Sequence, residues 1–96
     1  RFESQKKFDT CRNKRLLPFD FFLPDYNTII EFNGKQHYEI STRSKSYEKN
    51  LREFEQIQKR DAIKKQWAID NGYRFLEISY KEINQIEDIL SKELGI

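Results

Sequence analysis

Two acidic residues stand in stretches of this chain that are otherwise apolar. Asp20 lies within the run Phe19–Leu23, and Glu31 lies between Ile30 and Phe32. Ionised carboxylates in such strands lose hydration, and two of them on neighbouring strands repel each other. A divalent cation such as Mg²⁺ or Mn²⁺ offsets both costs, because it is bound by oxygen ligands. Two acids on the solvent face of a half-exposed hairpin would show the same pattern, so both interpretations stay open from these two residues.

Several kinds of polar side chain follow Glu31 within a few positions. His37, the only histidine, is a candidate proton carrier at neutral pH, although a structural or surface role is usual for a lone histidine. Lys35 and Gln36 are candidates to hold a phosphate or an attacking water. Gly34 would allow the backbone to approach a ligand closely. The segment therefore adds acid–base and phosphate-binding chemistry next to the second acid.

A long helix predicted over residues 48–71 carries two more charged candidates. Steps of three and four place on one face Phe54, Ile57, Asp61, Lys64 and Ala68. Asp61 and Lys64 thus interrupt a stripe that should face a sheet. They form either a local ion pair, being three residues apart, or a group in which Asp61 reaches the strand ends that carry the other two acids.

The elements that must position these residues follow from periodicity and turn signals. We predict a first helix over residues 2–13, ended by Pro18, and an antiparallel hairpin of strands 19–23 and 28–32. Residues 36–40 are a third strand or a continuation of the second, and residues 41–46 a loop. Asn71-Gly72 ends the long helix. Beyond it come a strand over residues 74–79 and an amphipathic helix on the stripe Ile83, Ile86, Ile89/Leu90 and Leu94. The predicted class is α/β (α+β): a mixed sheet flanked by helices, in the order α-β-β-(β)-α-β-α.

Length and composition exclude several classes of protein. Ninety-six residues predict one domain, residues 1–96, and the lack of any methionine suggests that it was taken from a longer protein. Charged residues make up 35% of the chain, and no apolar run approaches the roughly 18 residues of a membrane span. Aromatic residues at 15% argue against disorder, and one cysteine excludes an internal disulfide. We see no secretory signal and expect an intracellular protein, in the cytoplasm or nucleoid of a host cell.

Charge is distributed unevenly, although the net charge is only +2. Residues 1–16 and 35–60 are basic, whereas residues 17–34, which hold both strand acids, are acidic. Basic segments attract polyphosphate, and an acidic site between them would need a cation to accept it. Ordinary solvated surface charge remains an alternative explanation. The candidate contacts to DNA are Lys14, Arg15, Lys35, Arg43, Lys45 and Lys64.

Taken together, four segments resemble the PD-(D/E)XK nuclease superfamily, and within it the very-short-patch-repair branch and the EDxHD homing endonucleases of phages. These segments are Phe19–Pro24, Ile29–Tyr38, Arg60–Lys64 and Gly72–Leu76, and the resemblance spans nearly the whole chain. It implies a restriction-endonuclease-like sheet, with Asp20, Glu31 and the backbone carbonyl of Phe32 as metal ligands. By the same resemblance the other catalytic residues are Glu3, Gln36, His37 and Asp61.

The chain also departs from the superfamily pattern. Asn33 stands where a lysine is expected two residues after the second acid, so Lys35, Gln36 or His37 is left to take its role. The Cys/His zinc cluster of the repair enzyme is missing from the sequence. The identity of the general base and the number of metal ions therefore stay open.

The resemblance implies a Mg²⁺- or Mn²⁺-dependent endonuclease that hydrolyses phosphodiester bonds of double-stranded DNA, as the catalytic domain of a phage-type homing endonuclease. Sequence specificity would come from a further recognition domain or from a homodimer. The alternatives are a repair or resolvase-type nuclease, a nucleic-acid-binding module of the same fold without catalysis, and an assembly domain that uses the isoleucine stripe near the C-terminus.

Overall fold

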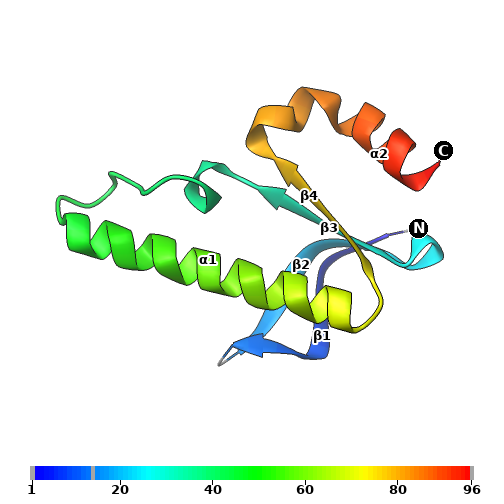
Figure 1. The fold of residues 1–96 in the computed structure, drawn as a ribbon, viewed down its shortest axis with the longest axis horizontal. Helices are drawn as coiled ribbons and strands as arrows, with labels where there is room; N and C mark the ends of the chain where they lie inside the picture. The colour runs from blue at the N-terminus through cyan, green and yellow to red at the C-terminus, as the bar shows by residue number, and fades with distance from the viewer. Residues whose placement is uncertain (1, 14, 96) are drawn as a thin grey trace.

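The computed structural model describes residues 2–13 and 15–95, and within them a four-stranded mixed sheet lies against a long helix (Figure 1). The strands, in the spatial order in which they pair, are β1 (Glu3–Asn13), β2 (Arg15–Leu23), β3 (Thr28–Asn33) and β4 (Arg74–Ser79). The helices are α1 (Tyr47–Asp70) and α2 (Ile86–Leu94), and three short 3-10 helices are η1 (Pro24–Tyr26), η2 (Lys35–His37) and η3 (Tyr80–Gln85). Strands β1, β2 and β3 pair antiparallel, whereas β3 and β4 pair parallel. The predicted α+β class with a mixed sheet is confirmed.

The predicted first helix is wrong, because residues 3–13 form strand β1 in a hairpin with β2. Phe8 and Cys11 are three residues apart, as on a helix, yet both contact the same core. The strand achieves this spacing through a register shift between Lys7 and Arg12, where five steps along β1 lie opposite two steps along β2 and the usual alternation is interrupted. A bulged strand therefore gave the same apolar spacing as a helix.

Strand β2 is longer than predicted and contains Pro18, which the sequence suggested as a breaker. The ladder between β2 and β3 covers only Phe21–Leu23 of β2. Pro18 pairs with Lys7 of β1 and lies outside that ladder, so the sheet tolerates a residue that has no N–H to donate. The predicted antiparallel hairpin of β2 and β3 is confirmed.

The strand predicted over residues 36–40 does not form. After β3 the chain turns through η2, where the N–H groups of His37 and Tyr38 donate to the carbonyls of Gly34 and Lys35. Lys35–Glu39 lacks the apolar alternation that would let it pack as a strand, and most of its side chains are exposed. The order of regular strands and α-helices is thus β-β-β-α-β-α.

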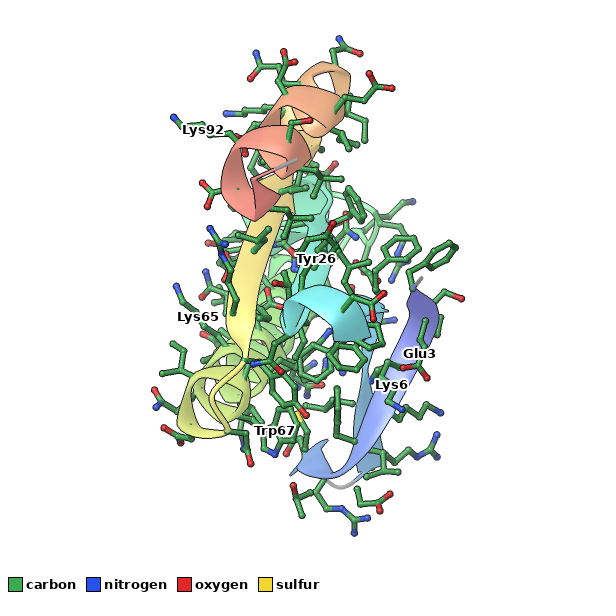
Figure 2. The ribbon with its side chains drawn as sticks, turned by 90° about the vertical axis from the view of Figure 1, so that its right-hand side faces the viewer. Glu3, Lys6, Tyr26, Lys65, Trp67 and Lys92 are labelled. Atoms are coloured by element: carbon green, nitrogen blue, oxygen red, sulfur yellow. The ribbon has the colours of Figure 1, made fainter. Side chains whose placement is uncertain are left out.

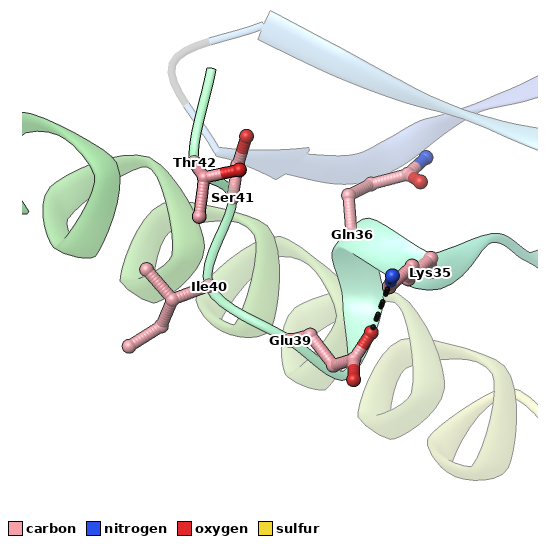
Figure 3. Close-up of a pocket in the computed structure, with 6 residues that line it drawn as sticks. All are labelled: Lys35, Gln36, Glu39, Ile40, Ser41 and Thr42. Carbon is pink, nitrogen blue, oxygen red and sulfur yellow. Dashed lines mark ion pairs between the residues drawn. The ribbon is translucent and has the colours of Figure 1, made fainter. Parts of the chain in front are cut away.

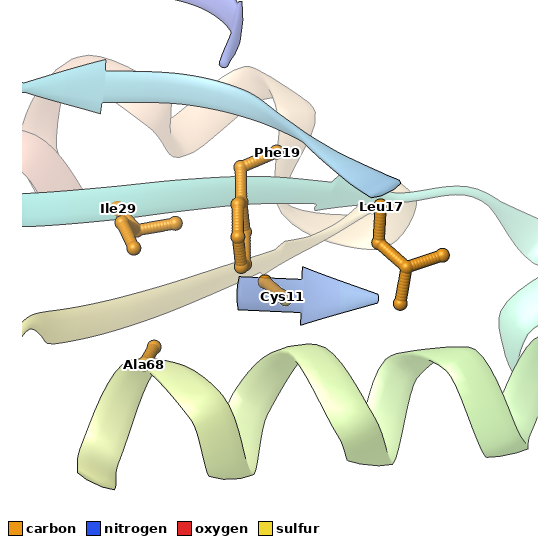
Figure 4. Close-up of a cluster of buried hydrophobic side chains, with 5 residues drawn as sticks. All are labelled: Cys11, Leu17, Phe19, Ile29 and Ala68. Carbon is orange, nitrogen blue, oxygen red and sulfur yellow. The ribbon is translucent and has the colours of Figure 1, made fainter. Parts of the chain in front are cut away.

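Helix α1 packs on the sheet along the predicted face. Its start is capped by Ser46, whose side chain accepts a hydrogen bond from the N–H of Lys49, and Gly72 follows its end at φ +78°. The buried core under it consists of Cys11, Leu17, Phe19, Ile29 and Ala68 (Figure 4). The small Ala68 side chain lets the helix approach the strands closely.

Trp67 fixes the end of α1 against the hairpin. Its ring stacks on Tyr73 and contacts Phe8, and its Nε1 donates to Thr10 Oγ1 at 2.9 Å. At the other edge of the sheet, Arg74 of β4 pairs with Glu93 of α2 at 2.7 Å. Among the described residues no helix combines the length and the apolar character required to traverse a bilayer.

Candidate active site

A pocket of about 390 Å³ opens between the sheet and helix α1, and the predicted chemical residues converge on it. Strands β2 and β3 contribute Asp20 and Glu31, η2 contributes Gln36 and His37, and α1 contributes Asp61. These segments are up to 41 positions apart along the chain. Five of the six predicted catalytic residues therefore share one pocket.

Asp20 and Glu31 lie on the same side of the β2–β3 hairpin. The pairs Phe21–Ile30 and Phe22–Ile29 set a register in which the next opposite positions are those of the two acids. Asp20 Oδ2 accepts a hydrogen bond from the N–H of Phe32 at 2.7 Å, which holds its carboxylate at the end of the ladder. The N–H and carbonyl of one strand residue point to the same edge, so the carbonyl of Phe32 also faces β2.

Glu31 is buried, with 6% of its surface exposed, and its proton affinity is unusual for that reason. Burial is the main cause that raises the pKa of Glu31 to about 7. The Lys64 ammonium opposes this shift, and the neighbouring Asp20 carboxyl adds to it. The two strand acids are thus close enough for Asp20 to influence the pKa of Glu31, which is one of the two interpretations that the sequence left open.

Lys64 of α1 is the counter-charge of Glu31. Its Nζ lies 2.6 Å from Glu31 Oε1 and 5.1 Å from the centre of the Phe19 ring. The approach is an ion-pair contact without the angles of a hydrogen bond, and within the described residues no donor is correctly directed at this buried oxygen. Helix α1 therefore brings a lysine to the second acid, whereas position 33 on the strand is an asparagine.

His37 and Asp61 form a second pair in the same pocket. His37 Nδ1 lies 2.6 Å from Asp61 Oδ2, and both side chains are partly buried. An ionised carboxylate can only accept, so Nδ1 donates to Asp61, and in the neutral ring this tautomer has its lone pair on Nε2. Nε2 has no hydrogen-bond partner among the residues that the structure describes. The local Asp61–Lys64 ion pair does not form, because each of the two bonds to a different segment.

The structure adds a residue that the sequence did not indicate. Gln5 of β1 has φ +50°, and its Nε2 approaches Asp20 Oδ1 at 3.5 Å. The pairs Ser4–Phe21 and Lys6–Phe19 place it opposite Asp20. A non-glycine residue at positive φ is uncommon and indicates a local constraint. Residue 5 was predicted on a helix, and its type gave no other signal.

Several predicted residues lie outside this pocket. Glu3 is exposed on β1 and pairs with Lys6 at 3.4 Å, so the helix position from which it was expected to act does not exist. Among the predicted DNA contacts, Lys35 pairs with Glu39 and Arg43 pairs with Glu53. Lys45 is exposed in the loop before α1, Arg15 lines a neighbouring pocket, and Lys14 lies outside the described residues.

Lys35 instead borders a second pocket of about 400 Å³, on the outer side of η2 (Figure 3). Its wall is made of loop residues Glu39–Thr42, and Gln36 reaches both this pocket and the active-site pocket. Figure 3 shows the ion pair between Lys35, in η2, and Glu39, which follows η2 in the chain. This pocket brings together none of the acids of the candidate site.

The donor set fits one divalent cation with few protein ligands. Among the described residues, Asp20 Oδ1 has only the long contact to Gln5, and the two carboxyl groups repel each other unless a proton or a cation lies near them. Within residues 2–13 and 15–95, no three side chains of His, Cys, Asp or Glu are grouped as a metal-chelating set. A cation here would be held by two carboxylates, a backbone carbonyl and water, which is ordinary for Mg²⁺.

Comparison of the chain with protein-family models, with curated proteins and with solved structures gave no match. The support for a function of this protein is therefore the arrangement of its own residues.

Proposed function

We propose that the protein is a metal-dependent endonuclease that hydrolyses phosphodiester bonds in DNA. The observation that supports this most is the convergence of two acids, a lysine and a histidine–aspartate pair on one pocket. Phosphodiester hydrolysis needs charge neutralisation at the phosphate and a base for water, and these groups supply both. The proposed chemistry is the same for a homing, a repair or a resolvase-type enzyme.

Asp20, Glu31 and the carbonyl of Phe32 are the groups that would hold the metal, which we propose to be Mg²⁺ or Mn²⁺. When bound, such an ion polarises a phosphate oxygen and makes a coordinated water more acidic. The N–H of Phe32 keeps Asp20 oriented without using its second oxygen. Lys64 keeps the charge of Glu31 compensated in its buried position and adds positive charge next to the phosphate site.

His37 is the candidate general base. Asp61 accepts the Nδ1 proton, which orients the ring and leaves the Nε2 lone pair for a proton from the attacking water. Asp61 is then a positioning residue that also stabilises the protonated ring. Gln36 lies at the same pocket and can orient water or a phosphate oxygen through its amide.

The proposal is tested by cleavage of supercoiled plasmid. We expect nicked or linear product in the presence of magnesium or manganese and intact plasmid in EDTA, because the acids alone repel the phosphate. Addition of excess magnesium to the EDTA sample should restore cleavage. Cleavage that proceeds equally in EDTA would contradict the proposal.

Substitution of His37 by alanine tests the base. We expect His37→Ala to lower kcat about a hundredfold, within the range for general base catalysis, while the Kd for DNA stays unchanged. Added imidazole should restore part of the activity of this variant, which no loss of structure would permit. Asp61→Asn should lower kcat without such rescue.

Lys35→Ala is the matched control for these variants, because Lys35 lies in the same short helix but outside the pocket. It should retain activity close to that of the wild type. A His37→Ala variant that cleaves as fast as Lys35→Ala would show that another group is the base.

A nucleic-acid-binding module without catalysis is the second candidate. The contact of Lys64 Nζ with Glu31 Oε1 favours it, because the lysine already compensates the acid that a cation would need. It would be supported if the protein bound DNA but cleaved no form of it with magnesium or manganese.

A further inference from the structure

A further pocket, of about 590 Å³, adjoins the active-site pocket along the β1–β2 hairpin and helix α1. Its basic side chains are Arg15 from β2 and Lys59 and Arg60 from α1. We call this pocket the basic groove. Arg15 was a predicted contact, whereas Lys59 and Arg60 come to it only because α1 crosses the hairpin.

The groove and the active-site pocket share part of their walls. Leu17, Pro18 and Arg60 line both of them. A chain bound across Asp20 and Glu31 can therefore continue into the groove over these three residues without leaving the surface. A polymer bound at the site would therefore extend along this shared wall toward the basic groove.

The cations of the groove lack the acidic partners that several other cations of this protein have. Lys35, Arg43, Lys64 and Arg74 each form an ion pair. Among the described residues, no ion pair or side-chain hydrogen bond joins Arg15, Lys59 or Arg60 to an acid, and no acidic residue lines the groove. Cations gathered without counter-charge attract a polyanion.

The remaining walls of the groove suit a sugar–phosphate chain. Leu16 and Pro18, which are partly exposed, form an apolar surface against which deoxyribose can pack. Asn13 and Gln56 add amide donors for phosphate oxygens. Cationic, amide and apolar groups thus line the same groove, and contacts to a nucleic-acid backbone use groups of these kinds.

We propose that the basic groove binds the phosphates of the DNA strand next to the bond that is cleaved. The proposal rests on the proposed function and adds to it the path of the substrate, from the acids across Arg60 to Arg15 and Lys59. These contacts position the backbone and read no sequence.

The test measures the binding of a labelled duplex oligonucleotide in EDTA by fluorescence anisotropy, over a range of salt concentrations. The double variant Arg15→Gln, Lys59→Gln should bind about tenfold more weakly for each cation that is replaced. The slope of log K against log salt should become shallower by about 0.9 for each phosphate that is no longer neutralised. Arg60 is left intact because it also lines the active-site pocket.

The control is Lys81→Gln, Lys92→Gln, which removes the same charge from exposed positions. Figure 2 shows Lys92 at the opposite end of the molecule from the tip of the β1–β2 hairpin. This control should bind DNA like the wild type. Circular dichroism of both double variants would verify that they are folded.

The outcomes separate this proposal from the proposed function. If the groove variant binds like the control and the wild type still cleaves plasmid, the groove proposal is overturned and the nuclease stands. If the groove variant loses binding but the wild type cleaves nothing, the proposal that the groove binds DNA is supported and the proposed nuclease activity is overturned. Failure of the wild type to bind DNA at low salt would overturn both.

Discussion

Asp20→Asn is expected to reduce plasmid cleavage about a thousandfold or more, because a metal contributes several kcal/mol to the stabilisation of a phosphoryl transition state. Asparagine keeps an oxygen that can accept the hydrogen bond from the N–H of Phe32, so the end of the hairpin is retained. It removes the negative charge and with it the attraction for a divalent cation. The measurement is the rate of plasmid nicking at saturating magnesium.

Glu3→Gln is the control for this variant. Glu3 is acidic and precedes Asp20 in the chain, but it is exposed and outside the pocket. Its cleavage rate should equal that of the wild type, and both variants should melt as cooperatively as the wild type. A fully active Asp20→Asn would remove the basis for a metal site at the hairpin.

The buried Glu31 is expected to make the metal-free protein more stable as the pH falls. Its pKa is raised from 4.5 to about 7 in the folded state, so the folded chain takes up a proton that the unfolded chain releases. The stabilisation is fully present at a pH below the pKa that Glu31 has in the unfolded chain. It is lost as the pH rises through the pKa that Glu31 has in the folded protein. Its size is about 3 kcal/mol, from 1.36 kcal/mol per pKa unit.

This effect is measured as the difference in free energy of unfolding between the wild type and Glu31→Gln, by urea denaturation in EDTA. The difference should shift in favour of the wild type as the pH falls from above about 7 to below 4.5. Glu77→Gln is the matched control. Glu77 of β4 lies opposite Glu31 of β3 in the strand register, but it is exposed. A difference that stays constant over this window would show that Glu31 does not gain a proton on folding.

Much of the sheet and of helix α1 was predictable, because it depends on short-range patterns. Apolar β-branched and aromatic runs bounded by turn residues predicted β3 and β4, and the stripe on α1 predicted the face that contacts the sheet. The position of Asp20 opposite Glu31 could be predicted from the sequence for the same reason. Each acid interrupts an apolar strand, and a short connection forces the two strands to lie side by side.

The identity of residues 3–13 as a strand was not accessible in this way. A bulge and the positive φ of Gln5 change the two-residue alternation, and the resulting apolar spacing imitates a helix. Pairing with β2 outweighed that local preference. The role of Gln5 beside Asp20 was hidden by the same error.

The candidate residues of the site could thus be identified from the sequence alone. Acids within apolar strands, a single histidine and charged residues within an apolar helix face are all local features. The partners of those residues were not. Asp61 and Lys64 are close enough on one helix to pair with each other, yet Asp61 bonds to His37 and Lys64 to Glu31. The docking of α1 decided this, because packing around Ala68 sets how the helix lies on the sheet and so which charged group each side chain meets. Contacts between residues distant in the chain depend on that rigid placement, for which neighbouring residues carry no signal.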